Sequence, residues 1–174
     1  DIHVANIMGF GLEHEFPLYT KQYAFGAAAL HREDEYILAT GQESPRTSGA
    51  GGLGHVITLG ASESIHIDDN HMDYRRYFKT AAAKGGISGF AHHGGTTGRF
   101  GAALVAPDGL INFIEVLTFN IGYYDRWYEL LNLGLRVAPV AGTDYPNIPM
   151  PGHSRFYTKV DGDFTFDNWL DGVR

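Results

Sequence analysis

The hydrophobic positions of the chain fall into short, nearly continuous runs separated by polar and glycine-rich stretches. Six of these runs have the length of a strand, at residues 4–10, 36–40, 55–59, 87–91, 110–117 and 135–141. Runs without a strict alternation of apolar and polar positions are typical of parallel strands that are buried on both faces. The pattern therefore predicts a sheet of parallel strands.

Two segments between these runs have the periodicity of a helix, at residues 72–84 and 123–133. The first ends at Gly85-Gly86 and the second at Gly134, and glycine commonly terminates helices. A strand-like run follows each glycine directly. This alternation of strands and helices predicts an α/β fold with a parallel sheet or barrel.

The chain shows no internal repeat and no linker, so residues 1–174 are expected to form a single domain. A strand-like run begins almost at once after Asp1, and the chain stops at Arg174 within another helical pattern. We therefore expect the sequence to be a fragment of a longer protein, truncated at both ends.

Composition narrows the possible functions. Of the 174 residues, 44% are hydrophobic, which is typical of a folded globular protein. The formal net charge of −7, without a basic cluster, argues against nucleic-acid binding, which requires concentrated Lys and Arg. No stretch of about eighteen apolar residues is present, so no membrane span is expected. Cysteine is absent, so a bound metal would have to be held by His, Asp and Glu.

Ionisable residues follow several of the predicted strands. Functional groups in parallel α/β folds gather just beyond the C-terminal ends of the strands. These positions hold Glu43, the pair His92-His93, and Asp144. His55 instead begins a run, so the chain must double back to bring it to the same edge. Imidazoles and carboxylates together are ligands for zinc, manganese or iron.

Each of these residues also has a purely structural interpretation. A carboxylate at the end of a strand can be a helix cap or a surface charge, and His92-His93 can be a hydrogen-bonded pair in a loop. The glycine-rich stretch at residues 48–54 lacks the Gly-Lys-Ser/Thr ending and the following helix of a phosphate-binding loop, so we reject that function for it.

Glu115 lies inside an apolar run, where a buried carboxylate requires a partner. Side chains alternate along a strand, so Glu115 and Phe113 should share one face while Ile114 and Val116 take the other. Glu115 either pairs with a structural Arg or points into the site and orients a ligand histidine. We favour the second interpretation, with Glu115 bonded to His92 or His93.

Taken in chain order, several short motifs together resemble the PHP-type metallohydrolases, and most of all the CehA/McbA-like branch. The resemblance extends from about Val4 to Arg174. The motifs are Gly-Gln-Glu at 41–43, Gly-His-Val-Ile-Thr-Leu-Gly at 54–60, Gly-Gly-Ile-Ser-Gly-Phe-Ala-His at 85–92, Ile-Glu-Val at 114–116, Trp-Tyr-Glu-Leu-Leu-Asn-Leu-Gly at 127–134 and Gly-Thr-Asp at 142–144.

The resemblance implies a distorted β/α barrel with a metal centre at the C-terminal ends of its strands. Glu43 matches the bridging carboxylate of the family, and His55 and His92 match later histidine ligands. Asp144 matches the aspartate of the final Ser-Asp-x-His motif. Arg155 stands where related sequences have an Arg before an aromatic-rich strand, which implies contact with an anionic group of the substrate.

The chain departs from the family pattern at three places. The opening His-x-His is absent, the usual Thr-Asp-His is replaced around residues 9–11, and the final motif reads Thr143-Asp144-Tyr145-Pro146 without its histidine. Two functions follow as alternatives. One is a non-catalytic PHP-like domain that has lost metal ligands and binds a ligand or a protein.

The favoured function is a metal-dependent hydrolase. It would use a metal-activated water on a small phosphoester, carbamate, ester or amide. Glu43, His55, His92 and Asp144 would hold one or two Zn, Mn or Fe ions. His93 or Arg155 would stabilise the developing negative charge.

Overall fold

The computed structural model describes residues 2–10, 25–44, 54–67, 74–92, 101–145, 147–148 and 150–174. The strands in these ranges are β1 (Val4–Phe10), β2 (His31–Glu33), β3 (Tyr36–Ser44), β4 (Val56–Leu59), β5 (Ile87–Phe90), β6 (Phe113–Thr118), β7 (Ile121–Gly122) and β8 (Ala138–Ala141). The helices are α2 (Tyr74–Ala83), α3 (Gly101–Val105), α4 (Tyr124–Asn132) and α5 (Phe166–Val173), with 3-10 turns η1 (Gly26–Ala29) and η2 (Ala106–Asp108).

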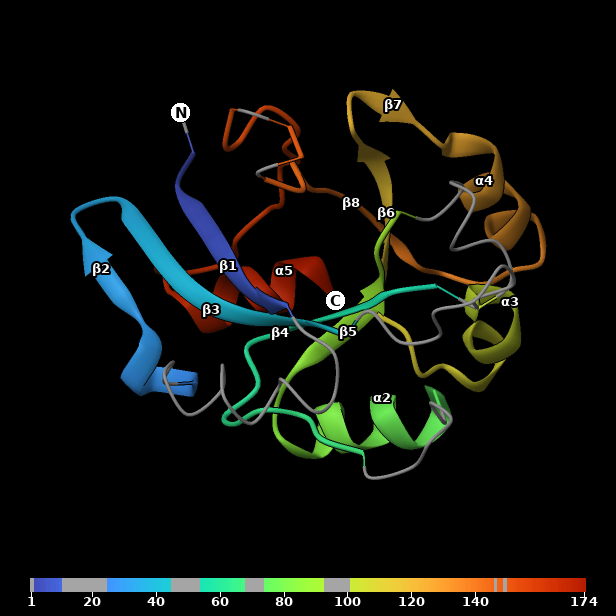
Figure 1. Ribbon diagram of the computed structural model, residues 1–174, viewed down its shortest axis with the longest axis horizontal. Helices are drawn as coiled ribbons and strands as arrows, with labels where there is room; N and C mark the ends of the chain where they lie inside the picture. Colours follow the sequence, from blue (N-terminus) through green and yellow to red (C-terminus); the bar gives the residue numbers. More distant parts are fainter. Residues whose placement is uncertain are drawn as a thin grey trace.

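The strands form one mixed sheet that curls into a half-barrel (Figure 1). Its main order is β1-β3-β4-β5-β6, and β8 also pairs with β6. The pairs β1–β3, β5–β6 and β6–β8 are parallel, as the hydrophobic runs predict. Among the described residues no pairing joins β1 to β8, so the sheet is open between these two strands.

The prediction of parallel strands throughout is wrong for β4, which runs antiparallel to both of its neighbours. No helical pattern separates the runs of β3 and β4, and a parallel neighbour needs a crossover, usually helical. The path of α2 explains why β4 is also antiparallel to β5. Helix α2 begins at Tyr74, whose hydroxyl donates a hydrogen bond to the Gly54 carbonyl, beside the start of β4. The helix ends near Ser62, whose N–H donates to Lys84, so β5 starts where β4 ends.

The predicted elements otherwise coincide closely with the observed ones. Each of the six hydrophobic runs contains a strand, and the two predicted helices are α2 and α4. The terminal helical pattern is α5, whose first turn is capped by the Thr165 side chain, which accepts a hydrogen bond from the Asn168 N–H. The short elements β2, β7 and α3 were not predicted, because two to five residues are too few to show a period.

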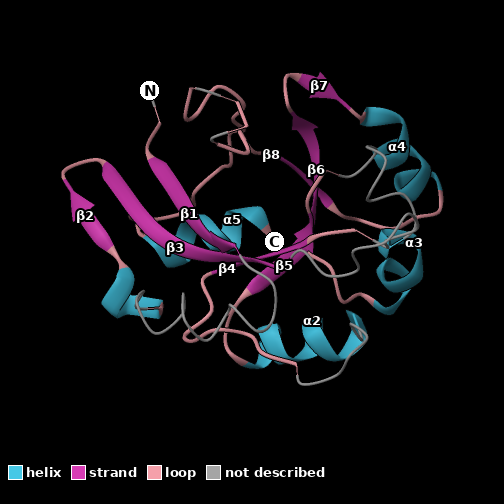
Figure 2. Ribbon diagram, viewed as in Figure 1, coloured by secondary structure: helices cyan, strands magenta, loops and turns pink. Residues whose placement is uncertain are grey.

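The two faces of the half-barrel carry separate hydrophobic clusters. Helices α2, α3 and α4 cover the outer face, and α5 lies within the curve of the sheet (Figure 2). Along β6, Ile114 and Val116 belong to the outer cluster and Phe113 to the inner one, as strand alternation predicts. Glu115 therefore faces inward, on the same side as Phe113.

Within the curve, helix α5 packs near the end of β4 and the start of β5, which are the strand ends farthest from the candidate site. Its Leu170 side chain occupies the space in which a side chain at Gly60, just after β4, would have to fit. Arg174 at its end donates a hydrogen bond to the Gly85 carbonyl, just before β5. No helix in the described part of the chain is long and apolar enough to cross a membrane.

Candidate metal centre

The reversal of the chain between β3 and β4 brings Glu43 and His55 together. Glu43 lies near the end of β3 and is paired in register with Ile57. Because β4 is antiparallel, its first residues lie at the edge where β3 ends. His55 Nδ1 is 3.0 Å from Glu43 Oε1. The antiparallel direction of β4 thus brings His55 to the same edge of the sheet as Glu43.

His92 reaches the same edge from the end of β5, in a left-handed backbone conformation with φ of 52°. Its backbone N–H donates a 2.7 Å hydrogen bond to Glu115 Oε2. Its ring Nδ1 is 3.2 Å from the same oxygen, while its Nε2 is 3.5 Å from Glu43 Oε1. Glu115 therefore fixes the direction of the ring, with Nε2 turned toward Glu43.

Glu115 is almost fully buried on β6, with 4% of its surface exposed. The site has room for its carboxylate because residue 142 is glycine, since a Cβ there would collide with Glu115 Oε1. Of the two partners weighed from the sequence, a histidine and a structural Arg, the contacts found are with His92. A carboxylate in this position sets the tautomer and orientation of an imidazole.

Asp144 lies at the rim of this group, just after β8. Like His92 it has a left-handed backbone, with φ of 55°. Its Oδ2 is 3.9 Å from His92 Nε2 and accepts a 3.2 Å hydrogen bond from the Asn147 amide. Left-handed backbones at non-glycine residues cost energy and are found preferentially at functional sites.

The electrostatics of the group favour charged forms of both Glu43 and His92. Burial acts to raise the pKa of Glu43, but hydrogen bonds and charge interactions with His55 and His92 outweigh it and lower the pKa to about 2. Burial acts to lower the pKa of His92, but hydrogen bonds and charge interactions with Glu115 and Glu43 outweigh it and raise the pKa to about 10. The site thus strongly stabilises positive charge beside its carboxylates.

The donor atoms of Glu43, His55 and His92 suit a metal ion. All three lie within 4.8 Å of one another. Two ligands of one tetrahedral ion, each about 2.1 Å from it, are about 3.4 Å apart. The observed separations of 3.0 Å and 3.5 Å from Glu43 Oε1 to the two imidazoles bracket that value. Imidazole and carboxylate donors fit zinc and its neighbours in the first transition series.

Comparison with known proteins gives a match at the level of the fold. Neither a family model nor a curated protein matches the sequence significantly. A solved structure does match, that of a two-domain protein from Bacteroides vulgatus ATCC 8482 that contains a predicted PHP-like metal-dependent phosphoesterase. The match has a TM-score of 0.53 and 16% sequence identity, and it covers 82% of this chain. The fold of this chain is therefore similar to that of the matched part of this protein.

This chain spans only 42% of the length of that two-domain protein. At 16% identity the likeness concerns the fold alone. Three of the residues named from the sequence as ligands, Glu43, His55 and His92, come from β3, from just before β4 and from just after β5, and they meet at one edge of the sheet.

Of the two residues predicted to stabilise negative charge, Arg155 and His93, the structure describes only Arg155. Arg155 is exposed, follows β8 by more than ten residues in sequence, and lines the cavity beside the site. His93 lies outside the described residues. The sequence analysis missed Thr118 and Phe119, which also contact His92. Thr118 Oγ1 is 3.5 Å from His92 Nδ1, and the Phe119 ring stacks on the His92 ring at 5.2 Å between centroids.

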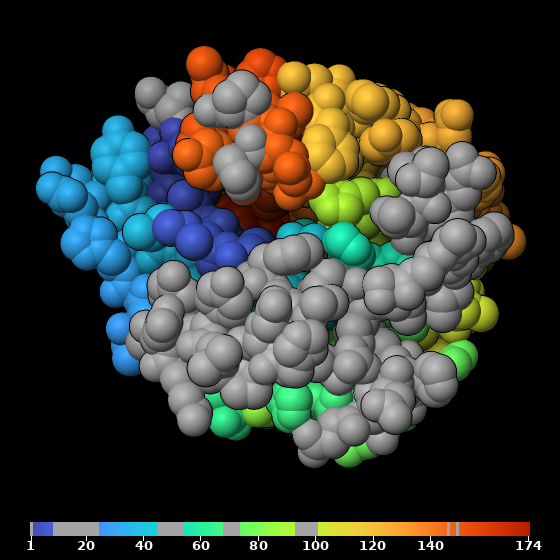
Figure 3. Space-filling view, viewed as in Figure 1, coloured from blue at the N-terminus to red at the C-terminus, as the bar shows by residue number. Residues whose placement is uncertain are grey.

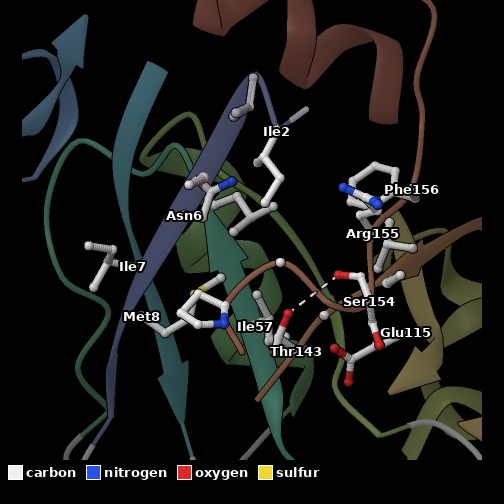
Figure 4. Close-up of a pocket in the computed structure, with 18 of the residues that line it drawn as sticks. Ile2, Asn6, Ile7, Met8, Ile57, Glu115, Thr143, Ser154, Arg155 and Phe156 are labelled. Carbon is white, nitrogen blue, oxygen red and sulfur yellow. Dashed lines mark hydrogen bonds between the residues drawn. The ribbon is translucent and has the colours of Figure 1, made fainter. Parts of the chain in front are cut away.

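The site opens into a cavity of about 1250 Å³ on the inner side of the half-barrel. Glu43, His92, Glu115 and Asp144 form part of its lining. Figure 3 shows the molecular surface hollowed between β1, in blue, and the orange segment that follows β8. In Figure 4 the β1 residue Asn6 faces Arg155 and Phe156 across this space, and Glu115 lies below Ser154.

Proposed function

We propose that this chain forms part of a metal-dependent hydrolase that acts on a small molecule. The observation that carries the proposal is the Glu43 carboxylate set between the His55 and His92 imidazoles, at one edge of a PHP-like sheet. Three such donors within reach of one another are the ligand set that a zinc, manganese or iron ion requires.

The residues around the site have different roles. Glu43, His55 and His92 hold the ion, and Asp144 adds a carboxylate from the rim. Glu115 orients His92 through its backbone and its ring. When bound, the ion lowers the pKa of a water molecule and polarises the bond under attack.

Negative charge that develops on the substrate is met by residues on the open side of the site. Arg155 lines the cavity and carries a planar guanidinium, which suits a phosphate or carboxylate group. His93 follows His92 directly in the sequence and is proposed to serve the same purpose. Both would act on the substrate and not on the ion.

We propose a phosphoester as the substrate class. The similar two-domain protein contains a predicted metal-dependent phosphoesterase, and Arg155 suits an anionic group. In the hydrolysis, the hydroxyl of water joins phosphorus, the bond to the ester oxygen breaks, and a proton passes to that leaving oxygen. Carbamates, carboxylic esters and amides are the other candidates, and a place in the CehA/McbA-like branch belongs to this proposal.

Two observations favour a second function, that of a non-catalytic domain that binds a ligand or a protein. The final family motif lacks its histidine, since Asp144 is followed by Tyr145-Pro146. Asp144 also lies 3.9 Å from His92 Nε2, farther out than the other donors. A domain of this kind would hold a ligand without hydrolysing it.

Hydrolysis assays distinguish the two functions. The protein should hydrolyse bis(p-nitrophenyl) phosphate after addition of Mn²⁺ or Zn²⁺, and a chelator should abolish the activity. Glu43→Gln removes the central carboxylate and should lower kcat/KM at least about 100-fold, in the range found when a group essential to catalysis is removed. Glu63→Gln is the matched control, because Glu63 is exposed and pairs with Lys84 at a distance from the site.

If Glu43→Gln left the activity intact, the reaction would not take place at the proposed metal site. If phosphate analogues bind, but no metal produces hydrolysis of any of the four substrate classes in the full-length protein, the non-catalytic function is correct.

A further inference from the structure

The cavity beside the candidate metal centre is much larger than a phosphate group needs. Its volume is about 1250 Å³, whereas pockets for drug-sized ligands typically measure about 300–1000 Å³. The site residues Glu43, His92 and Asp144 occupy only one part of the lining. The remaining volume must therefore receive some other part of a ligand.

The lining away from the site is mainly apolar. Phe156, Val160 and Phe164 contribute from the segment that follows β8, and Trp169 contributes from α5. All four belong to or pack against the inner hydrophobic cluster. The Phe156 and Trp169 rings lie 5.9 Å apart between centroids, which makes a continuous aromatic wall.

The opposite wall, formed by β1, contributes apolar residues together with the polar Asn6. Val4 and Met8 are half-buried, line the cavity and pack against the inner cluster. Ile7, with the opposite alternation, also lines the cavity but is 59% exposed. Covering apolar surface of this kind stabilises a complex by roughly 25 cal/mol per Å². The natural occupant is therefore apolar.

The charged groups of the candidate site, Glu43, His92 and Asp144, form one part of the lining, and Arg155 lines the same cavity. Other polar residues also line it, among them Asn6 of β1 and Thr143, whose hydroxyl donates a 3.4 Å hydrogen bond to the Ser154 carbonyl (Figure 4). A molecule that contacts both the candidate site and the aromatic wall carries an anionic group and a bulky hydrocarbon part.

We propose that the substrate is an amphipathic phosphoester, whose alkyl or aryl group lies between β1 and the segment that follows β8. This inference rests on the proposed function, which supplies the phosphoester chemistry. The hydrocarbon part binds along Met8, Phe156, Val160 and Trp169, and the phosphoryl group lies at Glu43, His92 and Arg155. Most of the selectivity between phosphoesters then comes from the hydrocarbon part.

Binding of n-alkylphosphonates, from methyl to octyl, tests this without turnover. The chain has two tryptophans, Trp127 and Trp169, and only Trp169 lines the cavity. Its fluorescence in a Trp127→Phe background reports occupancy in the presence of Zn²⁺. Each added methylene should tighten binding by up to about fourfold, the value for a fully buried methylene. Octylphosphonate should shift the emission of Trp169.

Val160→Glu places a charge in the apolar part of the cavity. It should remove the dependence on chain length, so that octylphosphonate binds no more tightly than methylphosphonate. Leu133→Glu is the control, because Leu133 is 74% exposed and does not line the cavity; this variant should behave as the parent does.

The outcomes separate the two proposals. Equal affinity for methyl- and octylphosphonate, or a chain-length dependence that survives Val160→Glu, would overturn the amphipathic substrate while leaving the metal site intact. If no phosphonate of any length binds more tightly with Zn²⁺ than without it, the proposed function itself is wrong.

Discussion

His92 shows how one side chain depends on groups that are distant in the sequence. Its place after a buried strand and the family resemblance named it as a ligand, and Glu115 was expected to bond to it or to His93. Both its backbone N–H and its ring Nδ1 contact Glu115, twenty-three positions later. Glu115 in turn depends on Gly142, since any side chain there would occupy the place of its carboxylate.

The role of Glu115 can be separated from a merely structural one. Glu115→Gln keeps the size of the side chain but loses the charge that orients and polarises the His92 ring. We expect the fold to persist and the affinity for Zn²⁺ to fall by about 10–100-fold, as for other carboxylates behind a ligand histidine. Isothermal titration calorimetry measures the affinity, and thermal unfolding measures the stability.

Glu129→Gln serves as the control for Glu115→Gln, because Glu129 is exposed and pairs with Arg126 on α4. A purely structural role for Glu115 would give the opposite pattern. The melting temperature of Glu115→Gln would then fall while its affinity for Zn²⁺ stayed at that of the control.

At the scale of the elements, the positions of the strands could be predicted, but not all of their directions. A run such as Val-Ile-Thr-Leu in β4 is equally apolar in either direction, so its burial shows where the strand lies and not which way it runs. The direction depends on the preceding connection and on α2. For that reason the hydrophobic runs alone could not place His55 next to Glu43, and only the family resemblance predicted that the two residues share a site.

A buried polar layer behind Glu43 joins these strands to α2. Tyr77 of α2 lies 3.0 Å from the Thr58 hydroxyl on β4, and Thr58 lies 2.8 Å from the Ser88 hydroxyl on β5. On β3 the Gln42 amide donates to the Ser44 hydroxyl, which donates to Tyr77 at 3.5 Å. Glu43 stands between Gln42 and Ser44 on the other face, so this layer fixes the strand that carries it.

The Tyr77 hydroxyl predicts a dependence of stability on alkaline pH. Burial raises the pKa of Tyr77 to about 12, although hydrogen bonds with Ser44 and Thr58 act to lower it. The unfolded chain releases this proton near pH 10. The contribution of protonated Tyr77 to the free energy of unfolding is therefore complete below pH 10. This contribution is lost as pH rises toward 12, and the loss is roughly 1 kcal/mol at pH 11.

Tyr77→Phe should cost about 1 kcal/mol at pH 7 through its lost hydrogen bonds, and it should lose less stability between pH 10 and 11 than the parent. Urea denaturation at pH 7, 10 and 11 measures both effects. Tyr128→Phe is the matched control, since Tyr128 is 54% exposed. Parallel loss of stability in parent and Tyr77→Phe would show that Tyr77 is not the group responsible.

At the scale of the whole molecule, the half-barrel places the candidate site and the large cavity on the same inner face. The α/β class, a barrel-like curved sheet and the proximity of Glu43, His55 and His92 were predicted from the sequence and its family resemblance. The cavity did not, because its walls come from β1, the segment after β8 and α5, whose proximity depends on the curvature of the sheet. Neither periodicity nor motif spacing encodes that curvature.

The most direct test of the central claim is a crystal structure of the zinc-loaded protein with anomalous data collected on both sides of the zinc edge. The account predicts a zinc peak about 2.0–2.2 Å from the Glu43 carboxylate and from the His55 and His92 imidazoles, with Glu115 still bonded to His92. Zinc bound elsewhere, or no anomalous peak among these three side chains at saturating zinc, would contradict it.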